Sequence, residues 1–110
     1  FSRGGDGTGI VYSNAALVSA NFNHYAFVKN PSGSNSFIYL NGVQVASGSI
    51  NDVSITKPFV FNGRWLNSGA DVSTGDAQAS QFSNISVYTK ALSAQEVLQN
   101  YNATKKRYGL

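Results

Sequence analysis

The sequence predicts an all-β protein, an antiparallel β-sandwich of jelly-roll type with one short helix near its C-terminus. Three observations support this fold class. Short runs of strand-forming residues alternate with turn residues, an Asn41-Gly42 pair marks a tight hairpin, and one helix-start motif stands at residues 93–96. Abundant Gly, Ser and Asn favour many short strands over a helical bundle. A length of 110 residues fits a single domain over residues 1–110.

Two strands are predicted before the hairpin. Residues 10–12 follow a glycine-rich opening, and residues 25–29 form an apolar run that ends at the turn-forming residues 30–33. Pro31 suits the second position of that turn because its φ is fixed by the ring. Residues 14–22 fit either a strand or a helical turn.

The hairpin is predicted from "FIYLNGVQV", residues 37–45. A two-residue type I′ turn needs positive φ at both central positions. Gly42 adopts that conformation without steric cost, and Asn41 tolerates it better than most residues. The flanking residues are strand formers, so two paired strands are expected here.

The second half of the chain predicts three further strands and one long loop. Residues 53–56 alternate apolar with polar side chains, and residues 58–61 carry Pro58 at the first position, where no ladder bond is lost. Residues 62–78 are polar and are expected to form a loop, and loops of this length are often functional. Residues 82–88 are predicted as the last strand.

A capping box predicts the helix over residues 93–102. The Ser93 hydroxyl is expected to accept from the Glu96 amide, while the Glu96 carboxylate accepts from the Ser93 amide. Leu92 and Val97 stand at the positions of a hydrophobic staple. An apolar stripe for docking on the sheet follows: Val97, Leu98 and Tyr101.

The charge pattern argues against nucleic acid and membrane partners. The net charge is +3, and Lys105, Lys106 and Arg107 supply it, since the other five basic residues balance five acidic ones. Three basic residues at a chain end are too few to track phosphates, and a solvated tail is the favoured interpretation. No apolar run approaches the roughly 20 residues that span a bilayer. The absence of Cys excludes disulfides and thiolate metal sites.

The inventory of reactive side chains predicts that the protein is not an enzyme. Glycoside hydrolysis in its usual form needs two facing carboxylates, but the one Glu is Glu96, which the capping box explains. The Asp residues fall in predicted turns and loops: Asp6, Asp52, Asp71 and Asp76. His24 is the only imidazole and no nucleophile motif adjoins it, so a structural role is expected.

The predicted ligand-binding residues lie in the loop of residues 62–78. Arg64 and Trp65 place a guanidinium beside an aromatic ring, a combination that suits stacking on a sugar or gripping a partner. Equally, Trp65 could plug one end of the sandwich. Asp71 and Asp76 could bind Ca²⁺ together with backbone carbonyls, although their spacing is not diagnostic. No other cofactor is expected, and the sequence does not decide whether a metal is bound.

Two segments resemble laminin-G-like, concanavalin A-type domains over residues 23–110. "NHYAFVKN" with "FIYLNGVQVASG" resembles their strand that leads into an Asn-Gly or Asp-Gly hairpin. "FSNISVYTKALSAQEVLQNY" resembles their closing strand and Leu-Ser-x-x-Glu helix start. The resemblance implies that the hairpin tip is structural. Glucanase relatives carry Glu-x-Asp-x-x-Glu, which is absent here, so no catalytic residue is carried over.

The end of the chain, "LQNYNATKKRYGL", is similar to the ends of such domains in bacteriophage particle proteins. This implies a virion component of a tail, fibre or capsid surface, which acts in assembly and host-surface attachment. The expected partners are other virion chains, a homo-oligomer and a cell-surface glycan. The alternative is a secreted or cell-surface carbohydrate-binding domain, located outside the cell. The chain is shorter than the family's domain, so we expect the C-terminal portion of a longer protein.

Overall fold

The structure of the chain is a computed structural model that describes residues 21–31, 33–50, 64–65, 72–73 and 81–110. Its elements in chain order are β1 (Tyr25–Val28), β2 (Asn35–Leu40), β3 (Val43–Ser49), β4 (Arg64–Trp65), β5 (Val72–Ser73), α1 (Ala94–Thr104) and the 3₁₀ helix η2 (Lys105–Tyr108). The strands predicted at residues 10–12, 53–56 and 58–61 lie outside this range. Within it, no helix has the length and apolar character needed to cross a membrane.

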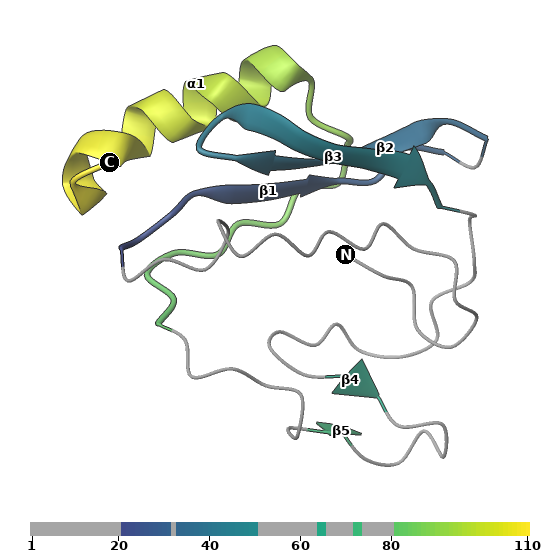
Figure 1. Cartoon of the computed structure of the whole chain (residues 1–110), viewed down its shortest axis with the longest axis horizontal. Helices are drawn as coiled ribbons and strands as arrows, with labels where there is room; N and C mark the ends of the chain where they lie inside the picture. Colours follow the sequence, from purple (N-terminus) through teal and green to yellow (C-terminus); the bar gives the residue numbers. More distant parts are fainter. Residues whose placement is uncertain (1–20, 32, 51–63, 66–71, 74–80) are drawn as a thin grey trace.

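The first three strands form an antiparallel sheet in the order β1-β2-β3 (Figure 1). The predicted hairpin joins β2 to β3, with Leu40 opposite Val43. Asn41 has φ 51° and Gly42 has φ 82°, so both central residues of the turn are left-handed. The predicted type I′ geometry is therefore confirmed.

A β-bulge interrupts the pairing of β2 with β3 at Val45. Ile38 lies opposite Ala46 and Tyr39 lies opposite Gln44, which leaves Val45 without a partner on β2. A bulge changes the direction of the following side chains on its strand. Here Val45 and Ala46, although consecutive, both pack against the cluster formed by Ile38 and Ile50.

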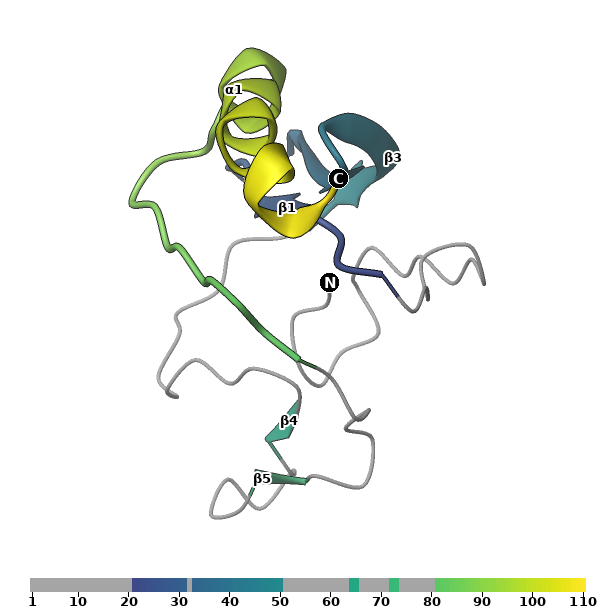
Figure 2. The same cartoon turned by 90° about the vertical axis from the view of Figure 1, so that its left-hand side faces the viewer.

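The sheet buries apolar side chains on both faces. On one face Val28 and Tyr39 pack against Val97 of α1, which is fully buried. Figure 2 shows the helix lying on this face of the sheet. On the other face Ile38 packs against Ile50. The alternation along β2 is that of a strand with two covered faces.

Helix α1 begins at the predicted capping box. The Glu96 amide donates to the Ser93 hydroxyl over 3.2 Å, and the Ser93 amide donates to the Glu96 carboxylate over 2.8 Å. The helix runs two residues beyond the predicted end and continues into η2. Gly109, with φ 69°, ends η2. The basic residues 105–107 therefore stand on a folded turn and not on a tail, although Lys106 and Arg107 are exposed to solvent as expected.

The last predicted strand is not formed. The structure assigns no strand to residues 81–93, and residues 81–91 are all exposed. Val87, within the predicted strand, is 81% exposed. Strand-forming residues need a neighbouring strand to pair with and a surface to pack on, and this segment instead runs outside the sheet to the start of α1 (Figure 1).

The segment of residues 62–78, predicted to be a loop, contains a short antiparallel ladder. Arg64 of β4 lies opposite Ser73 of β5, and Trp65 lies opposite Val72. The segment predicted to be a polar loop therefore contains two short strands that pair with each other.

We predict that Gly42→Ala destabilises the fold more than Gly33→Ala. Both glycines have positive φ, at 82° and 83°, so each substitution costs about 1–2 kcal/mol of backbone strain. A Cβ at Gly42 would also lie 2.8 Å from Cδ1 of Leu98 and 3.1 Å from the Tyr101 ring, whereas nothing lies within 4 Å at Gly33. We expect about 1 kcal/mol of additional loss at Gly42, measured by urea unfolding. Equal losses would contradict a close helix contact.

Candidate functional site

The hairpin turn is fastened to the start of β1 by three hydrogen bonds. The Asn41 amide donates to the His24 carbonyl over 2.8 Å, and the His24 amide donates to the Asn41 side-chain oxygen over 2.9 Å. The Asn41 side-chain nitrogen donates to the Asn23 side-chain oxygen over 2.9 Å. The turn residue therefore fixes the position of His24.

His24 lies between this turn and helix α1. Its ring centroid is 6.0 Å from that of Tyr101, in a tilted arrangement. Its Nδ1 atom is buried and has no hydrogen-bond partner. Burial lowers the pKa of His24 below its ordinary value of 6.5, so the neutral ring is favoured at pH 7. These contacts support the structural role expected for His24.

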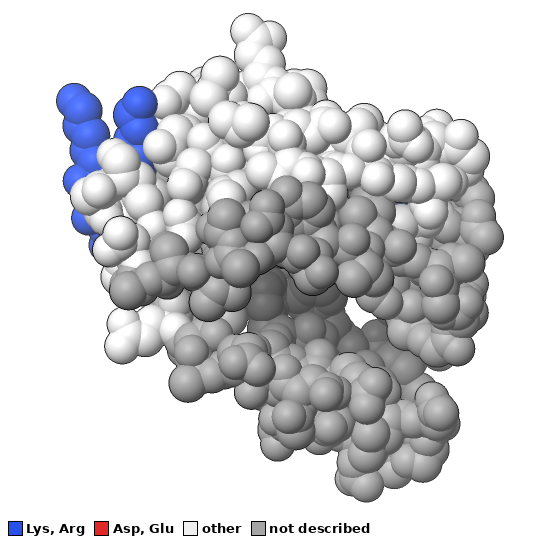
Figure 3. All heavy atoms as spheres, in the orientation of Figure 1, with Lys and Arg blue, Asp and Glu red and all other residues white. Residues whose placement is uncertain are grey.

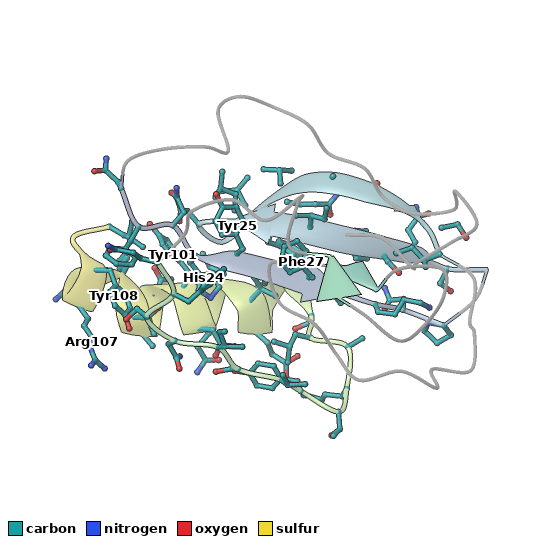
Figure 4. The ribbon with its side chains drawn as sticks, turned by 90° about the horizontal axis from the view of Figure 1, so that it is seen from below. His24, Tyr25, Phe27, Tyr101, Arg107 and Tyr108 are labelled. Carbon is teal, nitrogen blue, oxygen red and sulfur yellow. The ribbon has the colours of Figure 1, made fainter. Side chains whose placement is uncertain are left out.

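Aromatic and basic side chains gather where α1 runs into η2. The Lys105 ammonium lies 5.5 Å from the centre of the Tyr101 ring, and the Arg107 guanidinium lies 5.8 Å from that of Tyr108. Tyr108 also packs on Phe22, with 5.8 Å between ring centres. We call this set the aromatic–basic cluster: Phe22, His24, Tyr101, Lys105, Arg107 and Tyr108. Figure 4 shows His24, Tyr101, Arg107 and Tyr108 at one end of the molecule.

The exposed segment before α1 is tied to the same end. The Ser83 hydroxyl donates to the Tyr108 hydroxyl over 2.9 Å. The Asn100 side chain of α1 donates to the Tyr88 hydroxyl over 3.2 Å. The three-stranded sheet, the helix and this segment therefore all contribute to the surroundings of Tyr101 and Tyr108.

The chemistry of the aromatic–basic cluster suits binding. Figure 3 shows Lys and Arg side chains projecting from this end of the molecule. Phe22 is 43% exposed and packs on Tyr108, the ring that Arg107 also contacts. Cations attract anionic groups, and aromatic rings stack on flat apolar surfaces and on guanidinium planes.

The residues predicted as ligand-binding are only partly described. Arg64 and Trp65 are adjacent on β4, for which the structure describes the backbone pairing. Asp71 and Asp76 lie outside the described residues, so a shared site of these four stays a prediction, as does Ca²⁺ binding. In the part of the chain that is described, no three metal-ligating side chains gather.

Sequence reasoning missed the aromatic–basic cluster, although a signal for it was present. Tyr101 and Lys105 are four residues apart, the spacing that brings side chains together on a helix. Arg107 is followed directly by Tyr108. The prediction that these residues form a solvated tail hid both pairings, because it assumed that the helix ended earlier.

Residues 1–98 match the family model of the concanavalin A-like lectin/glucanases superfamily, laminin G type. The chain belongs to this superfamily. The predicted laminin-G-like relationship is confirmed, and the match also takes in the first 22 residues, which the resemblance left out. The fold of the superfamily is a β-sandwich, so the all-β prediction holds at that level.

A solved structure supports the fold. The chain is similar to an S-layer domain-containing protein (residues 221–444) from Clostridium thermocellum ATCC 27405, with a TM-score of 0.61 and 19% identity. The similarity covers 81% of this chain and 43% of the other, so this chain spans less than half of that structure. No curated protein matches the sequence.

We predict that His24 makes the fold less stable below pH 6.5. Because burial lowers its folded-state pKa, the unfolded chain takes up a proton first as the pH falls. The stability is present above the unfolded pKa and is lost below it, where a charged ring would be partly buried against Tyr101. Wild type should lose more unfolding free energy than His24→Gln between pH 7.5 and about pH 5.5. Parallel pH profiles would contradict this.

Proposed function

We propose that this chain is a non-enzymatic recognition module displayed on a surface. Its carrier in this proposal is a bacteriophage particle, as a tail, fibre or capsid-surface component that takes part in assembly and host attachment. The proposal rests on membership of a lectin-like superfamily together with the chemistry of Glu96.

The state of Glu96 is the observation that carries the non-enzymatic part. A glycosidase general acid must hold its proton near neutral pH, so its pKa is raised. Hydrogen bonding to Lys90, followed by the bond from the Ser93 amide, instead lowers the pKa of Glu96 to about 2. The one Glu of the chain is therefore ionised and occupied in capping α1.

The proposal has two candidate settings, a virion and a cell surface, and a different observation favours each. The chain end resembles those of bacteriophage particle proteins, which favours a virion. The S-layer domain-containing neighbour favours the second candidate, an extracellular or cell-surface carbohydrate-binding domain. In both cases the module works outside a cytoplasm and contacts a glycan or a neighbouring protein chain.

Assembly is the second half of the proposal. We propose a jelly-roll sandwich that is completed by contacts with other chains, either virion proteins or further copies of itself. Exposed strand edges readily pair with strands of another chain, which is how such contacts would complete the sheets. A glycan would then bind at Arg64 and Trp65.

We predict that the chain hydrolyses no member of a panel of β-glucans. Glu96 is held ionised in a helix cap and cannot donate a proton. Release of reducing ends, followed over hours at high protein concentration, provides the measurement. Turnover that Asp71→Ala or Asp76→Ala abolishes would overturn the non-enzymatic proposal, and Asp52→Ala serves as the matched control.

We predict that the isolated chain forms a closed homo-oligomer or is unstable alone. Size-exclusion chromatography with light scattering gives the mass, and a glycan array run in parallel tests binding. A stable monomer that binds one glycan class and loses it on Trp65→Ala would favour the cell-surface lectin over the virion component. Phe27→Ala is the control, because it removes an exposed aromatic side chain of β1 that belongs to neither proposed binding surface.

A further inference from the structure

The strongest unexplained feature is the basic end of the molecule. Lys106 and Arg107 are exposed on η2, and Lys105 is half-buried against Tyr101. The family match ends at residue 98, so it assigns no role to η2. Lys106 and Arg107 are exposed, so packing does not account for their charge.

We propose that the aromatic–basic cluster, together with Lys106, binds an anionic polysaccharide, one that carries carboxylate groups along its chain. This rests on the proposed function as a surface-recognition module and names the class of glycan that it recognises. The surface is separate in sequence from the predicted site at Arg64 and Trp65.

The charge balance of the described residues favours an anionic ligand. Glu96 is the only acidic residue among them, and its carboxylate bonds to Lys90 and to the Ser93 amide. The cations of η2 therefore have no acidic side chain beside them within the described part of the chain. Their positive potential extends into solvent, where it attracts anions.

The geometry of η2 favours a flexible polymer over a flat protein surface. A 3₁₀ helix has three residues per turn, so consecutive residues point in directions about 120° apart. Lys105, Lys106 and Arg107 therefore surround the end of the helix and do not line one face. A rigid acidic surface would meet only one or two of them, whereas a flexible polyanion can follow all three.

The aromatic rings favour a sugar polymer in particular. Tyr108 contacts both Phe22, with the ring centres 5.8 Å apart, and the Arg107 guanidinium, and Phe22 is partly exposed. Exposed ring faces beside a guanidinium offer apolar contact to the C–H face of a sugar while the cations meet its acidic groups. An acidic polypeptide would use the cations but would gain less from the rings.

A stabilising role at the helix end is the alternative explanation. Cations near a helix C-terminus interact favourably with the last carbonyls and the helix dipole. That role predicts an effect on unfolding and none on ligand binding, so the two explanations separate when stability and binding are measured on the same variants.

The test measures binding of the whole 110-residue chain to polygalacturonate by titration calorimetry, with dextran and poly-L-glutamate as comparison polymers. Lys106→Gln is expected to weaken binding about fivefold, and Lys106→Gln with Arg107→Gln about 20-fold, as for basic residues near other anionic surfaces. Lys29→Gln removes the same charge from the end of β1 and should change binding less than twofold. Raising the salt from about 0.05 M to about 0.5 M should remove most of the binding.

Each outcome decides the proposal. Selective binding to polygalacturonate that Lys106→Gln weakens and Lys29→Gln does not supports it, and Phe22→Ala should then weaken binding without changing the net charge. Equal binding of poly-L-glutamate would overturn it in favour of an acidic protein partner. Unchanged binding in the double variant, no binding, or a loss of stability alone would also overturn it. None of these outcomes produces hydrolysis, so the non-enzymatic proposal stands or falls separately.

Discussion

The close contact between the hairpin turn and helix α1 determines the arrangement of the rest. Gly42 closes the turn with a positive φ, and its missing side chain leaves room for Leu98 and Tyr101. Because Tyr101 reaches the turn, it also meets His24, which Asn41 holds in place. One glycine therefore serves two constraints, the conformation of a type I′ turn and the approach of a helix.

The same contact decides where binding groups can stand. Helix α1 covers one face of the sheet, with Val97 buried against Val28 and Tyr39. That face is core and offers no surface to a ligand. The helix instead carries its chain past the sheet and presents η2 at the end of the molecule (Figure 2). In the described part of the chain, exposed aromatic and cationic groups accordingly meet at this end, where packing makes no demand on Lys106.

Local signals in the sequence were reliable where a few neighbouring residues decide the structure. The Asn41-Gly42 turn and the Ser93 capping box are confirmed because each depends on the preferences of two residues. The strand at residues 82–88 failed because pairing requires a partner that sequence pattern cannot supply. The bulge at Val45 could not be predicted from the sequence, because the residue types of the strand are the same whether or not one of them is left unpaired. The site predicted at residues 62–78 is still to be tested.

The aromatic–basic cluster also shows how a binding surface can be added without disturbing a fold. Long basic side chains lose rotamer freedom when they bind, which weakens the contacts they make. Lys105 and Arg107 already rest on tyrosine rings, so less freedom remains to be lost. Those rings are held by His24, Phe22 and Ser83, which belong to segments far away in the sequence. The three-stranded sheet and helix α1 thus support the turn, and the charge of its exposed residues can vary while the packed residues stay the same.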